Sequence, residues 1–162
     1  MPPKTTCTGN LLDATYGIIV HGCNAQGKMG SGVAKEIRAR YPQNFDIYAK
    51  KHTTQGLKLG EVVWFRVSAE PQLAIANAVT QQYYGRVPGV RYMDYEALRK
   101  AFHEIGAVAR RHSLPVHYPK IGAALGGGDW DKISKIIDEE LRGVEQTLWL
   151  WSDPSLTRHH SP

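Results

Sequence analysis

The chain has 162 residues, 42% of them hydrophobic and 22% charged, and its formal net charge is +5. This size and composition predict one globular domain. No segment of the sequence approaches the roughly 20 apolar residues of a membrane span, and no apolar run follows the N-terminal Met-Pro-Pro-Lys. The chain has only two cysteines. We therefore expect a cytoplasmic protein with neither a disulfide framework nor a bound metal or cofactor. The positive charge suits either a small polyanionic partner or solubility alone.

The first third of the chain predicts two strands and two helices. A short strand is expected over residues 5–9. A second is expected over Tyr16–His21, where a nearly continuous β-branched run is typical of a parallel strand buried on both faces. Helices are predicted over residues 31–40 and 43–55. Pro42 ends the first, because proline lacks the backbone donor, and Gly56 ends the second.

The remaining elements continue the alternation. Strands at residues 61–67 and 72–79 are joined by a tight turn, and an amphipathic helix follows from Asp94, its expected N-cap, to His112. A strand at residues 115–118, a helix at 131–141 and a strand at 146–151 complete the pattern. Alternating strands and helices predict a single α/β domain over residues 1–151, with a sheet covered on both faces. Residues 152–162 lack apolar periodicity and are expected to form a flexible tail.

Two glycine-rich loops follow predicted strands: the first loop, residues 22–32, and the second loop, residues 121–128. Ligands of open α/β sheets lie at the carboxyl ends of strands, and glycine lets the backbone approach them closely. Amides at the start of the next helix then hold anionic oxygens. One such loop is equally well a tight turn, but two together favour an anion site. Neither has the spacing of a dinucleotide-binding or P-loop motif, which disfavours a nicotinamide oxidoreductase or an NTPase.

Few side chains near these loops suggest catalysis. His21 suits a general acid or base near neutral pH, although a buried histidine with satisfied hydrogen bonds is the common alternative. Asn24 suits a pair of ribose hydroxyls, or is a turn asparagine. Asp129 and Asp131 lie at a helix start, where one of them is expected to be the N-cap. Spacing alone identifies no catalytic triad, acid pair or cysteine nucleophile.

Four segments in the same order resemble macrodomains: Gly9-Asn10, residues 20–37, residues 75–81 and residues 119–130. The resemblance covers residues 5–151. It implies a three-layer α/β/α fold whose mixed, mostly parallel central sheet carries ADP-ribose across its crest.

The resemblance also implies the ligand contacts. Asn10 stands where the family usually has aspartate, which weakens the expected adenine contact. The second loop is expected to hold one side of the diphosphate, and the start of the helix after the first loop the other side. The expected ligand-binding residues are Asn10 and Leu11 near the adenine, Asn24 at the distal ribose, Gly30, Ser31, Gly32 and Val33 where the first loop meets the next helix, Thr80 and Gln81 after the central strand, and Ile121, Gly122, Ala123, Ala124, Leu125 and Gly126 in the second loop.

The branch that the chain resembles most holds ADP-ribose-1″-phosphate phosphatases and glycohydrolases that free terminal ADP-ribose from acidic side chains. In those glycohydrolases a lysine after the central strand attacks the ribose and an aspartate in the second loop assists. The matching positions here are Gln81 and Gly126, which argues against that mechanism. The phosphatases carry a histidine at the position of His21.

We therefore expect a phosphatase that converts ADP-ribose 1″-phosphate into ADP-ribose and phosphate, with His21 as acid/base group and Asn24 as positioner. The alternatives are an ADP-ribosyl hydrolase acting on modified macromolecules and a reader that binds ADP-ribose without chemistry. The expected partner is ADP-ribose or its 1″-phosphate, with nucleic acid only as an ADP-ribosylated substrate. The chain is expected to act as a monomer.

Overall fold

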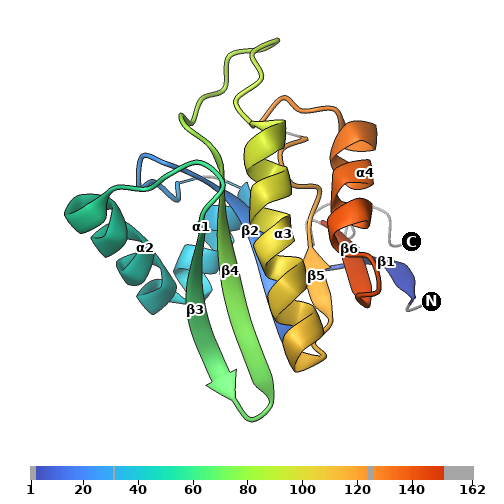
Figure 1. The fold of residues 1–162 in the computed structure, drawn as a ribbon. Coiled ribbons are helices and arrows are strands. Elements are labelled where there is room, and N and C mark those ends of the chain that lie inside the picture. The colour runs from blue at the N-terminus through green and yellow to red at the C-terminus, as the bar shows by residue number, and fades with distance from the viewer. Residues whose placement is uncertain (1–2, 31, 124–125, 152–162) are drawn as a thin grey trace, which may run out of the picture.

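The computed structural model describes residues 3–30, 32–123 and 126–151, and its strands and helices alternate as the sequence predicts (Figure 1). One short element, the 3₁₀-helix η1, was not predicted, and residues 152–162, the predicted tail, lie outside the described residues. In chain order the elements are β1 (Lys4–Thr8), η1 (Leu11–Asp13), β2 (Gly17–Asn24), α1 (Gly32–Arg40), α2 (Pro42–Gln55), β3 (Val62–Ala69), β4 (Gln72–Gln81), α3 (Tyr95–His112), β5 (Val116–Tyr118), α4 (Trp130–Glu140) and β6 (Gln146–Leu150).

The six strands form one sheet in the order β1-β6-β5-β2-β4-β3. Five neighbouring strands run parallel, and only β3, paired with β4, is antiparallel. The predicted mixed, mostly parallel sheet is therefore confirmed. Strand β2 lies inside the sheet, and Ile18, Ile19 and Val20 are fully buried. This burial on both faces explains its unbroken apolar sequence.

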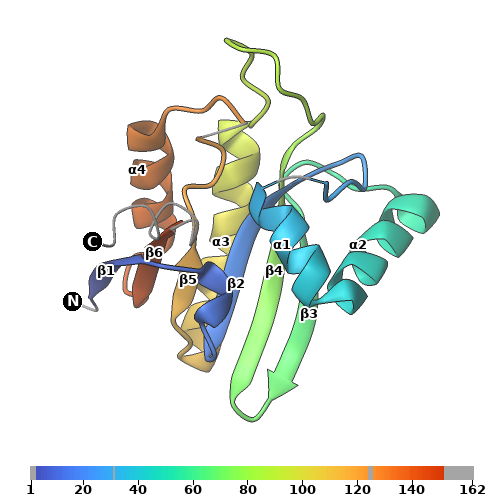
Figure 2. The same ribbon diagram turned by 180° about the vertical axis from the view of Figure 1, so that it is seen from behind.

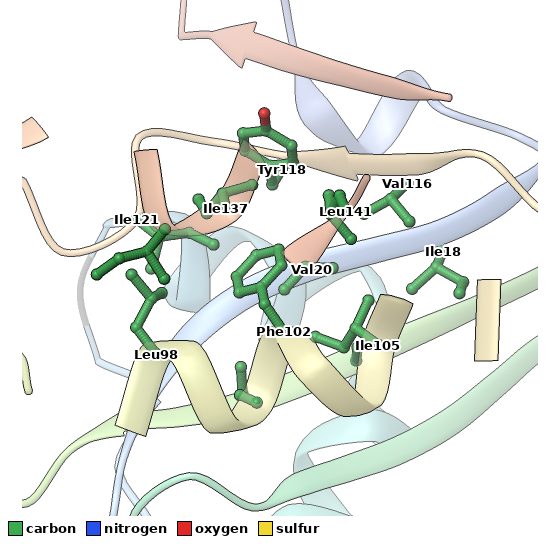
Figure 3. Packing of buried hydrophobic residues seen from close by; sticks show 14 of the residues in the cluster. Ile18, Val20, Leu98, Phe102, Ile105, Val116, Tyr118, Ile121, Ile137 and Leu141 are labelled. Carbon is green, nitrogen blue, oxygen red and sulfur yellow. The ribbon is translucent and has the colours of Figure 1, made fainter. Parts of the chain in front are cut away.

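Helices cover both faces of the sheet, which gives the three layers. Helices α3 and α4 lie on one face, and α1 and α2 on the other (Figures 1 and 2). Figure 3 shows the core beneath α3 and α4, where Phe102 of α3 packs among residues of β2, β5 and α4. Its ring meets that of Tyr118 edge-to-face, with centroids 6.1 Å apart. The opposite face buries Ile19 and Ile75 with Ile37 of α1.

The helix ends follow the predicted caps. The Asp94 carboxylate accepts a hydrogen bond from the backbone N–H of Ala97 (2.9 Å) and so begins α3. Asp129 accepts one from the N–H of Asp131 (3.0 Å), which makes Asp129 the cap of α4. Helix α2 ends at Gly56, whose φ of +77° suits glycine.

The parallel strands β2, β4 and β5 end at the same edge of the sheet, and both glycine-rich loops leave from this edge. The β2–β4 register shifts between Cys23 and Asn24, so the chain departs from regular pairing just where the first loop begins. None of the helices in the described ranges has the length and apolar character to cross a membrane.

Candidate functional site

A cavity of about 710 Å³ lies at the carboxyl ends of β2 and β4, between the two glycine-rich loops. This volume is within the range of small-molecule sites. Gly30 and Gly32 border it from the first loop, and Gly122 and Gly126 border it from the second. Two turns about ninety residues apart in the sequence therefore meet at one cavity.

The cavity wall contains most of the residues that the sequence singled out. Those that border it are His21, Asn24, Gly30, Gly32, Val33, Thr80, Gln81, Ile121, Gly122 and Gly126. Asn10, Leu11 and Ala123 are not in the wall. Ser31, Ala124 and Leu125 lie outside the described residues. That any of these residues binds ADP-ribose stays a prediction.

Asn10 and Leu11 have structural contacts of their own. The side chain of Asn10 caps η1, where its Oδ1 accepts a hydrogen bond from the N–H of Leu12 (2.9 Å). Leu11 is only 3% exposed and belongs to the core cluster against which Val33 packs. Leu11 therefore lies in the core behind Val33, and neither Asn10 nor Leu11 borders the cavity.

The side chain of Asn24 closes the first loop on itself. Its Oδ1 accepts hydrogen bonds from the backbone N–H groups of Gln26 (3.0 Å) and Lys28 (3.2 Å), and its Nδ2 donates to the carbonyl of Lys28 (2.9 Å). The hydroxyl of Tyr48 lies 3.1 Å from the same Oδ1. The structure thus gives Asn24 the turn-forming role that the sequence left as an alternative, and one amide hydrogen remains for a ligand.

Helix α2 supports the first loop from behind. Tyr48 is fully buried, and its hydroxyl donates a hydrogen bond to the backbone carbonyl of Asn24. Burial raises the pKa of Tyr48, so the hydroxyl keeps its proton. A Cβ on Gly27 would lie 2.8 Å from Nδ1 of His52, and the φ of Gly27 is +75°. Only glycine therefore lets the loop lie this close to α2.

The second loop is held by main-chain hydrogen bonds. The N–H of Gly128 donates to the carbonyl of Gly122 (2.7 Å). The carbonyl of Gly126 accepts from the N–H groups of Tyr92 (2.7 Å) and Met93 (3.1 Å). A Cβ on Gly126 would lie 2.6 Å from the carbonyl oxygen of Gly122. This turn closes so tightly that no side chain fits at Gly126.

His21 belongs to a buried polar network that joins β2, β4 and α2. Its Nε2 lies 2.6 Å from Oδ1 of Asn77. The Asn77 amide nitrogen donates to Oδ1 of Asn44 (2.7 Å) and to the carbonyl of Val63 (2.9 Å), which fixes the orientation of the Asn77 amide. Because the Asn77 Oδ1 must then accept, the network assigns the proton of His21 to Nε2 and leaves Nδ1 as an acceptor.

The protonation state of His21 follows from this burial. Desolvation lowers the pKa of His21 to about 4, although the hydrogen bond to Asn77 acts in the opposite direction. His21 is therefore neutral at pH 7 and can accept a hydrogen bond at Nδ1, while its lowered pKa makes it a weak base. Its catalytic role stays a prediction. Burial also raises the pKa of Cys23, which argues against a thiolate nucleophile there.

Sequence reasoning did not identify Asn44 and Asn77 as part of this site. Both are fully buried, and Asn77 lies next to His21 in the β2–β4 register. The available signal was Asn77 itself, a polar residue inside the apolar run Ile75–Val79 of a buried strand. A buried amide needs partners, so its presence there indicates a network.

The wall of the cavity is rich in positive charge, which the linear sequence did not show. Besides one acidic residue, Glu36, it contains five cationic ones: Lys28, Lys35, Arg38, Arg86 and Lys120. Such a surface attracts polyanions, and planar guanidinium groups suit phosphate oxygens. In the described part of the chain, no group of three or more His, Cys, Asp and Glu side chains is placed to hold a metal ion.

A projecting segment, residues 82–92, forms one rim of the cavity, and we call it the rim loop. Figure 1 shows it rising above the sheet between β4 and α3. An isolated antiparallel bridge between Gln81 and Met93 closes its neck. The N–H of Tyr84 donates to Oε1 of Gln26 in the first loop (3.0 Å), and Tyr84, Gly85 and Arg86 border the cavity. The rim loop thus contacts both glycine-rich loops.

Comparison with known proteins gives a consistent family. The sequence model of the Macro domain family matches residues 20–137 of this chain. A DNA ADP-ribosyl glycohydrolase of Thermus aquaticus is 26% identical over 155 residues, which cover 94% of this chain and 42% of that protein. An ADP-ribose 1″-phosphate phosphatase of Aspergillus clavatus is 42% identical over 45 residues, 27% of this chain and 23% of that protein. This chain therefore spans less than half the length of both relatives.

Among solved structures, the macrodomain of Mycobacterium tuberculosis DarG superposes with a TM-score of 0.78 at 23% identity, covering 92% of this chain and 98% of that one. At this identity the likeness concerns the fold.

Proposed function

Because this chain belongs to the macrodomain family, we propose that its cavity binds ADP-ribose and that the protein hydrolyses the bond to a group carried at the 1″ position of the distal ribose. The observation that carries the proposal is the meeting of the two glycine-rich loops at one cationic cavity. A diphosphate placed between them would receive main-chain N–H groups from both sides.

The proposed contacts follow from the wall. Gly30 and Gly32 would hold one side of the diphosphate, and Gly122 and Gly126 the other. Asn24 keeps the first loop in shape beside the distal ribose. Since Gln81 occupies the position of the glycohydrolase lysine, and its amide donates to the carbonyl of Tyr83 (2.8 Å), water is the proposed nucleophile.

Our first candidate reaction is hydrolysis of ADP-ribose 1″-phosphate, in which water and the ester give ADP-ribose and inorganic phosphate. His21 borders the cavity, and we assign its unprotonated Nδ1 to receive the proton of the attacking water. The cationic wall, including Lys28 and Lys120, suits a substrate with a third phosphate. The relatives named ADP-ribose 1″-phosphate phosphatases agree with this candidate.

A second candidate is an ADP-ribosyl hydrolase that frees ADP-ribose from a modified macromolecule. The observation that favours it is the match over 94% of this chain to a relative named DNA ADP-ribosyl glycohydrolase. The two candidates share the ADP-ribose site and differ in the leaving group. A substrate comparison therefore separates them.

The test combines calorimetry with turnover. Wild type is titrated with ADP-ribose, then incubated with ADP-ribose 1″-phosphate, ADP-ribosylated single-stranded DNA and ADP-ribosylated protein. Phosphate release supports the first candidate, and release of ADP-ribose from an acceptor supports the second. Binding without any turnover identifies a reader, and an absence of ADP-ribose binding contradicts the whole proposal.

His21→Ala tests the assigned base, with His117→Ala as the matched control. His117 bonds through Nε2 to the carbonyl of Tyr16 and does not border the cavity. Slower turnover by His21→Ala alone, with ADP-ribose binding retained, supports the role. Equal rates for the wild type and His21→Ala would remove His21 from the mechanism.

A further inference from the structure

The rim loop presents an unusual surface beside the cavity. Tyr83 and Tyr84 are 63% and 58% exposed, and Val87 is 60% exposed. Arg86 and Arg91 are exposed as well. Residues 82–93 contain no aspartate or glutamate. Large aromatic side chains usually bury their rings, so two adjacent exposed tyrosines flanked by arginines indicate a binding surface.

The hydrogen bonds of the rim loop hold it in place while leaving the two tyrosine rings free. Its neck is fixed by the Gln81–Met93 bridge and by the two bonds to the carbonyl of Gly126. Near its tip, the N–H of Val87 donates to the hydroxyl of Tyr92 (3.2 Å). A held loop loses little conformational entropy when a partner binds, so this surface is prepared for contact.

Charge indicates the chemistry of the partner. The arginines of the rim loop continue the cationic wall of the cavity, which contains Arg86 of this loop and Lys120 just before the second loop. A phosphate backbone complements this surface. A typical protein partner carries charges of both signs and would be matched by a surface that has acidic as well as basic groups. Exposed tyrosines stack on unpaired bases, whose faces a duplex would hide.

We propose that the rim loop binds a single-stranded nucleic acid, with Tyr83 and Tyr84 stacking on bases and Arg86 and Arg91 contacting phosphates. The inference rests on the second candidate of the proposed function, because the strand would carry the ADP-ribose that enters the cavity. The same chemistry serves DNA and RNA, so both are included in the test. The strand would run from the mouth of the cavity along residues 83–91.

The test measures fluorescence anisotropy of unmodified 12-nucleotide single strands of DNA and RNA, with a duplex for comparison, at several salt concentrations. Wild type is expected to bind a single strand more tightly than the duplex, and to bind more weakly as salt rises. Tyr83→Ala and Tyr84→Ala are each expected to weaken binding about tenfold, since each removes an aromatic ring on which a base would stack. Arg91→Ala is expected to reduce the slope of log affinity against log salt concentration by about one.

Tyr16→Ala is the matched control, because Tyr16 is also exposed (47%) but precedes β2, at the opposite end of that strand from the cavity. It should bind strands like the wild type. ADP-ribose calorimetry on Tyr83→Ala and Arg91→Ala, whose side chains do not border the cavity, should match the wild type. A variant that keeps ADP-ribose affinity is thereby shown to be folded.

Several results would overturn the inference while the proposed function stands. They are ADP-ribose binding with no affinity for any single strand, equal affinity for strand and duplex, and strand binding that Tyr83→Ala and Tyr84→Ala leave unchanged. The last two would indicate contact with the phosphate charge alone. Loss of ADP-ribose binding in the wild type would instead contradict the proposed function itself.

Discussion

The first and second glycine-rich loops border the same cavity and are held in different ways. In the first, the side chain of Asn24 bonds to three backbone groups of its own loop, and Tyr48 of α2 supports it. In the second, the carbonyls of Gly122 and Gly126 make the closing bonds, and all the partners are main-chain N–H groups. The shape of the first loop therefore depends on polar side chains, and the shape of the second loop depends on glycines, which have no side chain.

The layers beneath the loops differ as well. Beneath the first lies the buried polar network of His21, Asn77 and Asn44. Beneath the second lie apolar groups: a Cβ on Gly122 or Gly128 would meet the side chain of Met93 at 3.1 and 2.8 Å. An anion site can thus be built by either route, and the two walls should respond to different perturbations.

Lowering the pH should destabilise the protein through the buried network beneath the first loop, and this is the largest effect that we expect. The pKa of His21 is about 4 in the folded protein and 6.5 when unfolded, so between these values the unfolded state binds a proton that the folded state does not. The free energy of unfolding should be constant above about pH 6.5 and fall below it, with a total loss near 3 kcal/mol by pH 4. Urea denaturation at pH 7.0, 5.5 and 4.0 measures this loss.

The matched variant for this titration is His21→Gln, which cannot take up the proton. It should lose less stability than the wild type over the same pH range, while His117 titrates in both proteins. Parallel pH dependences would show that His21 is solvated in the folded state.

Gly126→Ala tests the second wall. The added Cβ would lie 2.6 Å from the carbonyl oxygen of Gly122 and 2.8 Å from its Cα, both backbone atoms. We expect a loss of about 2 kcal/mol of stability, the usual cost of overpacking, and ADP-ribose binding at least tenfold weaker. Thermal unfolding and calorimetry measure the two effects. Gly30→Ala, which would meet no atom within 4 Å, should retain wild-type stability, and equal melting temperatures for both variants would contradict the steric argument.

Asn24→Ala tests the polar side chain of the first wall. The change leaves the N–H groups of Gln26 and Lys28 without their partner, so we expect a loss of about 1–2 kcal/mol of stability and weaker ADP-ribose binding. Asn24→Asp keeps the accepting oxygen and should recover part of the stability. If alanine and aspartate behave alike in urea denaturation, the loop does not depend on these acceptor bonds.

Tyr48→Phe should have the smallest effect of the four. It removes one hydroxyl from the carbonyl of Asn24 and should cost about 1 kcal/mol. Amide hydrogen exchange over residues 24–28 should accelerate. Tyr118→Phe is the control, since its hydroxyl bonds to Gln146 on β6, and it should leave exchange in the first loop unchanged. The same exchange pattern in both variants would mean that α2 does not position the loop.

Much of the fold was predictable because local patterns determine it. The apolar run of β2, the cap at Asp94 and the glycine at the end of α2 each depend on neighbours within a few positions. The helix η1 escaped prediction because three residues are too few for a periodic pattern. It is held by the side chain of Asn10, which accepts from the N–H of Leu12, and by two main-chain bonds, from Asp13 to the carbonyl of Asn10 and from Ala14 to the carbonyl of Leu11.

The candidate site was predictable in its outline and not in its bonding. Glycine spacing after two strands indicated both loops. The network around His21 joins residues up to 56 positions apart, and the β2–β4 register and the position of α2 bring them together. The two possible roles of Asn24 also could not be separated without the position of Lys28. Side-chain partners at such separations depend on the assembled sheet rather than on local sequence.

The way the rim loop is anchored has a consequence for engineering. Its ends are fixed at the Gln81–Met93 bridge and the Gly126 carbonyl, while residues 87–89 are exposed and do not border the cavity. That stretch is therefore a cassette: its sequence is open to replacement by grafting while the cavity below keeps its shape. Libraries randomised there would redirect the protein to new acceptors without rebuilding the scaffold.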